Sequence, residues 1–104
     1  MSDPTDSEIE AAGKMTEALE TFERARGHLY SFHQLIGSAD LALDDVLEAL
    51  GQAGREDLAE PLRERLLGRN VIADRWTFQI IEDFEDGYAA EGRRQEAAVR
   101  DALT

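Results

Sequence analysis

The chain has 104 residues, of which 42% are hydrophobic and 33% are charged, and 23 acidic against 11 basic side chains give a net charge of −12. This length fits one domain, and the hydrophobic fraction is too high for general disorder. The negative charge repels nucleic-acid phosphates and anionic lipid headgroups, so neither a nucleic acid nor a membrane is expected as a partner.

The chain has no cysteine and no long hydrophobic run, and its first six residues carry acids where a signal peptide needs bases. Disulfides, thiolate metal sites and a cysteine nucleophile are therefore excluded, and a cytoplasmic location is expected. Lys14 is the only lysine. Two explanations of this acidic, lysine-poor composition stay open: a GC-rich genome and halophilic adaptation, in which high salt screens the self-repulsion of the surface.

Hydrophobic spacing predicts a disordered tail at residues 1–6 and then a helix from Ser7 to Ile36. Ser7 and Glu10 fit a capping box at its start, and Gly37 fits a C-cap at its end. Residues seven positions apart, with partners three positions later, indicate a coiled-coil seam on this helix. These are Met15, Phe22, Leu29 and Ile36, with Ala18, Ala25 and Phe32 as their partners.

Two short helices are predicted next, at residues 40–53 and 57–67, each followed by a glycine. Because proline is best placed in a first turn, Pro61 suggests that the second of them begins nearer Glu60. A last long helix is predicted from Asp74 to Leu103. A strand at 71–80 is the rival interpretation, but no second strand is available to pair with it, so the helix is favoured.

The predicted fold is all-α: residues 7–104 form a single helical domain of two long antiparallel helices, with a short helical hairpin between them. The hairpin covers the end of the long helices that holds the seven aromatic side chains. The other end, at residues 9–18 and 91–103, is rich in alanine and buries too little surface to be stable alone. A second copy would complete a helical bundle there. The predicted dimer interface comprises Ile9, Ala12, Met15, Leu19, Glu91, Gln95 and Val99.

Polar and aromatic residues at the aromatic end are candidates for ligand binding: Arg26, His33, Trp76, Glu85 and Tyr88. In the antiparallel arrangement, Arg26 comes near Glu85 and Tyr88, and His33 comes near Thr77. One interpretation is structural, with the polar groups satisfying one another and fixing the helix register. The other is a small polar pocket for a small molecule or a metal ion.

No catalytic residue and no cofactor is predicted, because the sequence lacks a phosphate-binding glycine loop, a G-x-S-x-G elbow, an HExxH motif and an EF-hand loop. A di-iron site is also excluded, since neither histidine follows a glutamate at the required spacing. The sequence therefore predicts a non-enzymatic helical interaction or scaffold protein that acts as a homodimer. Two alternatives remain: a small-molecule or metal-binding bundle with its pocket at the aromatic end, and an acidic protein that mimics DNA.

Overall fold

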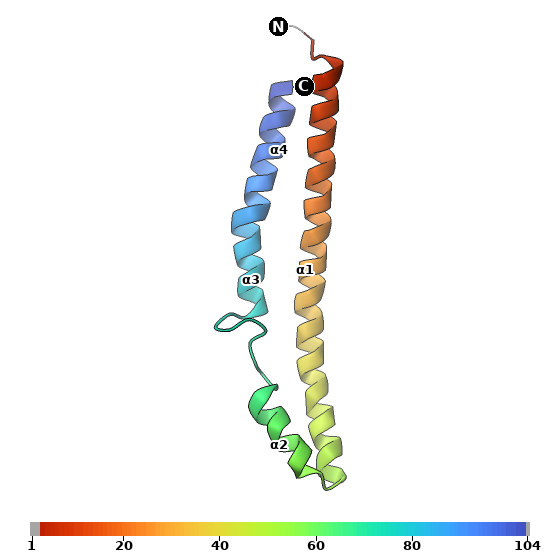
Figure 1. The fold of residues 1–104 in the computed structure, drawn as a ribbon, viewed down its shortest axis with the longest axis vertical. Helices are drawn as coiled ribbons and strands as arrows, with labels where there is room; N and C mark the ends of the chain where they lie inside the picture. The colour runs from red at the N-terminus through yellow and green to blue at the C-terminus, as the bar shows by residue number, and fades with distance from the viewer. Residues whose placement is uncertain (1–2, 104) are drawn as a thin grey trace. The chain divides into compact units, whose positions relative to one another are not determined.

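The computed structural model describes residues 3–103, which form helices and no strand (Figure 1). An isolated antiparallel bridge joins Ile72 and Arg75. The all-α prediction is therefore confirmed. The chain divides into two compact units: unit 1 comprises Met1–Leu29 and Ile80–Thr104, and unit 2 comprises Tyr30–Gln79.

The first helix, α1, spans Asp6–Gln52 and has 47 residues. The predicted break at Gly37 is therefore wrong, and the first two predicted helices are one. Gly37 does not adopt the left-handed conformation of a C-cap, whereas Gly54, just after α1, does so at a φ of 71°. A glycine within a helix costs only about 1 kcal/mol, which continued packing along the helix offsets.

The start of α1 lies close to its predicted position, but other residues cap it. Thr5 and Glu8 form the capping box, each accepting the backbone N–H of the other at 3.1 Å. Of the predicted tail, residues 1–2 lie outside the described residues, residues 3–5 are not helical, and Asp6 begins α1. Thr5 and Glu8 have the same spacing as Ser7 and Glu10, so they form the same motif two residues upstream.

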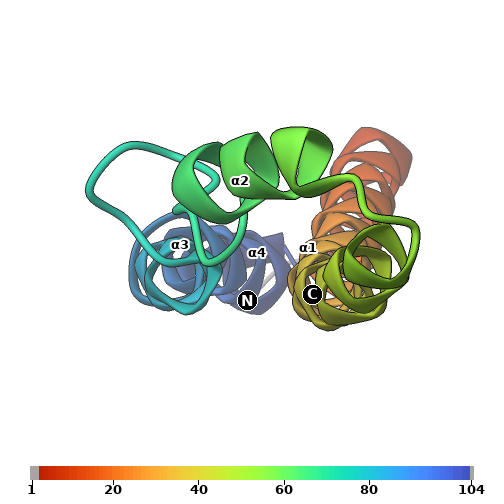
Figure 2. The same ribbon diagram turned by 90° about the horizontal axis from the view of Figure 1, so that it is seen from below.

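The second helix, α2, spans Glu56–Arg65 and lies beside the last turns of α1 (Figures 1 and 2). Pro61 lies inside it, so the predicted start near Glu60 is wrong. The hydrogen bond that a proline cannot donate would have reached the carbonyl of Asp57 in the first turn of this exposed helix. Water can satisfy that carbonyl, so the proline is tolerated.

The last predicted helix begins at Thr77, not at Asp74, which has a φ of 64°. The Gln79 side chain accepts the backbone N–H of Trp76 at 2.8 Å and so caps the new start. Three segments follow in sequence: α3 at Thr77–Phe84, a π-helical segment η1 at Glu85–Ala89, and α4 at Ala90–Leu103. Of the disputed stretch 71–80, residues 77–80 are helical and no strand forms.

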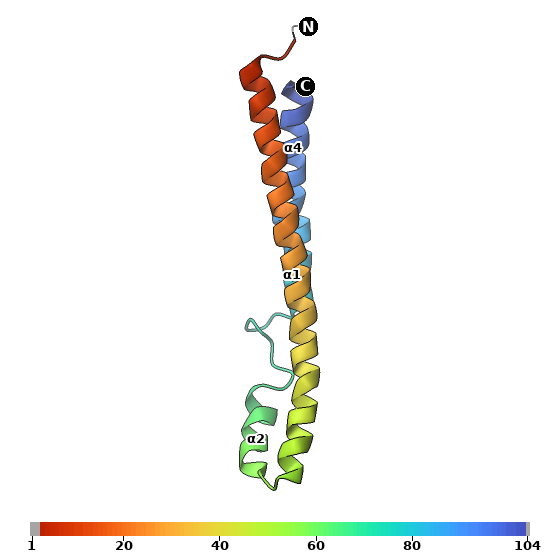
Figure 3. The same cartoon turned by 90° about the vertical axis from the view of Figure 1, so that its right-hand side faces the viewer.

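In unit 1, α4 runs antiparallel to the first half of α1 (Figures 1 and 3). Thr16 donates a hydrogen bond to Glu96 at 3.2 Å, and the rings of Phe22 and Tyr88 lie 5.2 Å apart. Ile81 is the largest buried apolar side chain of the described residues, and Glu96 is buried beside Thr16. Small side chains complete this core: Ala12 and Ala89.

One row of α1 residues, here called the covered seam, is buried or half-buried along the whole helix. Its members alternate at spacings of three and four, which is the coiled-coil pattern. They are Glu8, Ala12, Met15, Leu19, Phe22, Arg26, Leu29, His33, Ile36, Asp40, Leu43, Leu47 and Leu50.

The seven-residue repeat from Met15 to Ile36 is confirmed, but two of its three predicted partners, Ala25 and Phe32, are exposed and therefore wrong. Arg26 and His33 take their places, while Ala18 is half-buried like its neighbour Leu19. Polar partners on the returning chain explain this choice. Arg26 pairs with Glu85, His33 Nδ1 lies 2.5 Å from Thr77 Oγ1, and Asp40 accepts the backbone N–H of Gly68 at 2.8 Å.

Candidate interaction surface

Unit 2 exposes most of its large hydrophobic side chains. Of twelve exposed large hydrophobics among residues 3–103, ten lie in unit 2, and Ala59 is the single buried hydrophobic residue described there. The ten are Phe32, Leu35, Leu41, Val46, Leu58, Leu66, Val71, Ile72, Trp76 and Phe78. Apolar side chains left in water at this density are typical of an interaction surface.

Several of these side chains form a second row on α1, here called the exposed seam. It has the same alternation of three and four as the covered seam, and all of its members are apolar and exposed. They are Phe32, Leu35, Ala39, Ala42, Val46 and Ala49, followed by Ala53 just beyond the end of α1. The Ala53 N–H still bonds to the Ala49 carbonyl at 3.0 Å, so the helical spacing holds to the end of the row.

The polar side of the exposed seam carries almost no charge. The residues that flank it there, one per heptad, are Ser31, Ser38, Asp45 and Gln52, so one of four is charged. On its other side the exposed seam borders Ile36, Leu43 and Leu50 of the covered seam. An apolar helix face with this spacing is the face that a coiled-coil partner covers.

The structure divides the predicted ligand-binding residues between the two units. Arg26, Glu85 and Tyr88 belong to unit 1. Arg26 Nε donates to Glu85 Oε1, and the Tyr88 ring packs against Phe22 and against Phe84, whose ring centroid is 5.9 Å away. Arg26 and Glu85 thus pair with each other and Tyr88 packs on aromatic rings, which supports the structural interpretation of these residues.

A second ion pair lies beside the first. Arg93 donates two hydrogen bonds to Glu23, at 2.9 and 3.3 Å, and its Nη1 lies 4.0 Å from Glu85 Oε2. The hydrogen bond from Arg93 lowers the pKa of the Glu23 carboxyl. Both side chains are about two-fifths exposed, so water screens this pair and its contribution to stability is small.

Arg26→Ala, Glu85→Ala and the double variant are expected to show a coupling of about 1–2 kcal/mol in unfolding free energy. The side chains of Arg26 and Glu85 are 37% and 23% exposed, so water screens this pair only in part. Urea unfolding of the three variants measures the coupling. The more exposed pair Lys14–Glu10, with side chains 72% and 68% exposed, is the control, with an expected coupling below about 0.5 kcal/mol. Equal coupling in the two pairs would contradict a role for burial.

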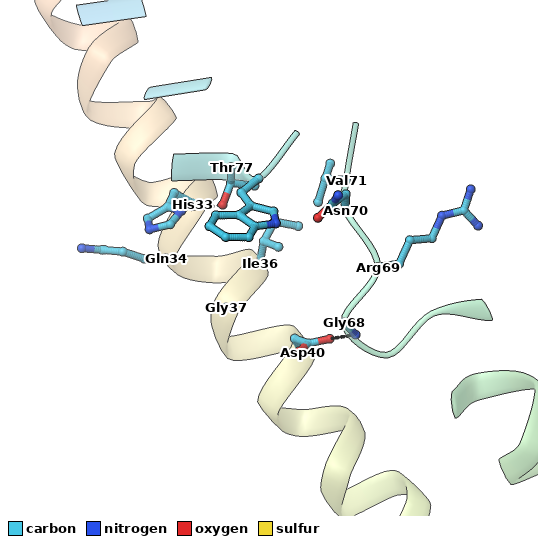
Figure 4. Close-up of a pocket in the computed structure, with 11 residues that line it drawn as sticks. His33, Gln34, Ile36, Gly37, Asp40, Gly68, Arg69, Asn70, Val71 and Thr77 are labelled. Carbon is cyan, nitrogen blue, oxygen red and sulfur yellow. Dashed lines mark hydrogen bonds between the residues drawn. The ribbon is translucent and has the colours of Figure 1, made fainter. Parts of the chain in front are cut away.

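His33 and Trp76 belong to unit 2 and line one open cavity of about 320 Å³ (Figure 4). The His33 ring is hydrogen-bonded to the Thr77 hydroxyl, and the Asp40 carboxylate accepts a hydrogen bond from the Gly68 N–H. Arg69, also at the cavity, points its guanidinium away in Figure 4, and its Nη1 lies 3.4 Å from the Arg65 carbonyl.

His33 and Asp40 are thus each hydrogen-bonded to another residue that lines this cavity. Trp76 is 67% exposed and offers an apolar face. Within residues 3–103, no three histidine or carboxylate side chains are grouped closely enough to hold a metal ion. The proposed pocket for a small molecule stays a prediction.

The seven residues of the predicted dimer interface all lie in unit 1. Ala12 is buried within the chain, Met15, Leu19 and Val99 are half-buried, and Ile9, Glu91 and Gln95 are exposed. Met15, Glu91 and Gln95 line a hollow of about 240 Å³ between α1 and α4. Hydrogen bonds from Gln95 and Arg94 lower the pKa of the Glu91 carboxyl. That these seven residues form a dimer interface stays a prediction.

No protein-family model, curated protein or solved structure matches this chain. None of the helices in residues 3–103 has the length and hydrophobicity that crossing a membrane requires.

Sequence reasoning missed the exposed seam, although its signal was present. The predicted break at Gly37 divided the row between two helices, and Phe32 was assigned to the seam that faces the rest of the chain. The regular spacing from Phe32 to Ala53 was the evidence that could have shown it.

Proposed function

We propose that this chain is a non-enzymatic helical interaction protein that acts as a homodimer, and that its two copies meet through the exposed seam of α1. The observation that carries the proposal is the unbroken run of seven exposed apolar residues at coiled-coil spacing. Three of them are large: Phe32, Leu35 and Val46, with exposed fractions of 41%, 68% and 42%.

The small core of unit 2 supports the need for a partner. This unit has 50 residues, and Ala59 is its one buried hydrophobic residue. Chains this short rarely reach a stable core unless metals, disulfides or association add to it. Fully burying a large aliphatic or aromatic side chain contributes about 1.5–3 kcal/mol, so covering the seam supplies stability that the unit lacks.

The distribution of charge also favours association through unit 2. Unit 1 has fourteen acidic and six basic residues, a net charge of −8, whereas unit 2 has nine acidic and five basic residues, a net charge of −4. Two copies that meet through unit 2 bring together the less negative parts of the chain. Because almost no charge lies beside the exposed seam, two copies of this acidic chain repel each other little when their seams meet.

Light scattering coupled to size-exclusion chromatography tests the proposal. We expect twice the 11.6 kDa mass of one chain at micromolar concentrations. The measurement is made at about 0.15 M and about 1 M salt, because the Debye length falls from about 8 to about 3 Å and self-repulsion is then screened. A mass of one chain at both salt concentrations, over the whole micromolar range, would overturn the proposal.

A further inference from the structure

We infer that the two copies pair their exposed seams antiparallel, across a two-fold axis that passes between Ala39 and Ala42. This inference rests on the proposed homodimer and specifies the geometry of its interface. Its evidence is the order of large and small residues along the seam and the chemistry of the residues on its two sides.

The order of side-chain sizes favours the antiparallel direction. Layers of an antiparallel pair combine the two kinds of seam position, so each residue from Phe32 to Ala49 faces one from the other half of the seam. Small side chains then meet at the axis, where two crossing helices lie closest, and larger ones fill both ends, where the helices diverge. The layers are Ala39 with Ala42, Leu35 with Val46 and Phe32 with Ala49 of the second copy.

A parallel pair would place each residue opposite itself. Phe32 would face Phe32 and Leu35 would face Leu35 at one end, while Ala39 and Ala42 would form two successive layers of alanine pairs. Both kinds of layer destabilise an interface: layers of two large side chains strain the packing, and layers of two small side chains leave cavities. The parallel direction is therefore disfavoured.

The residues on the two sides of the exposed seam also favour antiparallel pairing. In an antiparallel pair, residues on one side of the seam meet the same side of the partner, whereas in a parallel pair they meet the opposite side. Antiparallel pairing thus joins the polar flank to itself and brings Ser38 close to Asp45 of the second copy. On the other side it brings the half-buried Ile36, Leu43 and Leu50 of the covered seam toward the same residues of the second copy. Parallel pairing would instead place serine and aspartate against leucine and isoleucine.

Cysteine cross-linking tests the direction, and the natural chain has no cysteine that could interfere. In the antiparallel pair, positions 49 of the two copies lie 17 residues apart along the helix, about 25 Å. A disulfide requires Cα atoms within about 7 Å. Ala49→Cys alone is therefore expected to give no disulfide-linked dimer on mild oxidation. An equal mixture of Ala49→Cys and Phe32→Cys is expected to give a linked species that contains one chain of each.

A mixture of Ala49→Cys with Lys14→Cys, which lies on the exposed surface of unit 1, controls for random collision and should stay unlinked. Light scattering before oxidation shows whether Ala49→Cys alone, and its equal mixture with Phe32→Cys, form dimers, because Phe32 is itself a large residue of the exposed seam. If the dimers are intact and Ala49→Cys links to itself, or fails to link to Phe32→Cys, the antiparallel inference is overturned while the proposed homodimer stands. A mass of one chain for the wild type would instead overturn the homodimer itself.

Discussion

Leu35→Asp is expected to convert the proposed dimer to single chains, raising the dissociation constant by at least about 100-fold. Leu35 is 68% exposed in one chain, so its replacement removes little packing from the free chain. In the dimer, the new carboxylate would be buried between two helices without a cationic partner. Burying an unpaired charge costs several kcal/mol, and about 2.7 kcal/mol is enough for a 100-fold change. Light scattering over a dilution series measures the change.

Leu41→Asp is the matched control. Leu41 lies six residues further along α1 and is 71% exposed, but it lies on another face of the helix from the exposed seam. The substitution adds the same charge to the same helix, so it reproduces any general effect of charge or helix propensity. We expect it to leave the dimer intact. Equal dissociation by both variants, or a dimeric Leu35→Asp, would contradict the proposed interface.

Ile81→Ala is expected to lower the free energy of unfolding by about 2–4 kcal/mol, the range for a large-to-small change in a core. Ile81 is 3% exposed, and it is the one buried apolar residue larger than alanine among residues 3–103. Urea unfolding followed by circular dichroism measures the loss, at a single protein concentration because association shifts apparent stability.

Ile9→Ala removes the same atoms from the same unit and serves as the control. Ile9 is 52% exposed, so its truncation leaves no enclosed cavity, and we expect a change below about 1 kcal/mol. A loss at Ile81 no larger than the loss at Ile9 would show that the packing of α3 against α1 contributes little to unit 1.

The helical class and the long first helix were predictable because spacings of three and four residues recur in the sequence. The break at Gly37 was predicted from a local signal, although Ile36, Leu43 and Leu50 keep the seven-residue repeat across it. Packing along a repeated face outweighs a local cost of about 1 kcal/mol for one glycine. Pro61 and Asp74 are different cases: water can satisfy the carbonyl that Pro61 leaves without a donor, and a local cap from Gln79 starts the last helix at Thr77.

The candidate site was predictable in part. Antiparallel packing placed Arg26 near Glu85 and His33 near Thr77, and the structure contains both contacts. Hydrophobicity alone did not identify the correct companion row of the covered seam. It favoured Ala25 and Phe32 over Arg26 and His33, because the polar partners that allow charged residues in a seam lie more than forty positions away in the chain. Because the prediction assigned Phe32 to the covered seam, the exposed seam was not recognised from the sequence.

The π-helical segment η1 accommodates one extra residue in the chain that returns along α1. The residues of the returning chain that face α1 are spaced by four residues twice in succession, from Ile81 to Glu85 and from Glu85 to Ala89, before the alternation of four and three resumes. The returning chain thus contains one residue more than a regular heptad repeat requires. The wider turn of η1 keeps all three residues on the same face. An insertion of one residue has in effect been absorbed within a single turn, without rotating Gly92 and Glu96 away from α1.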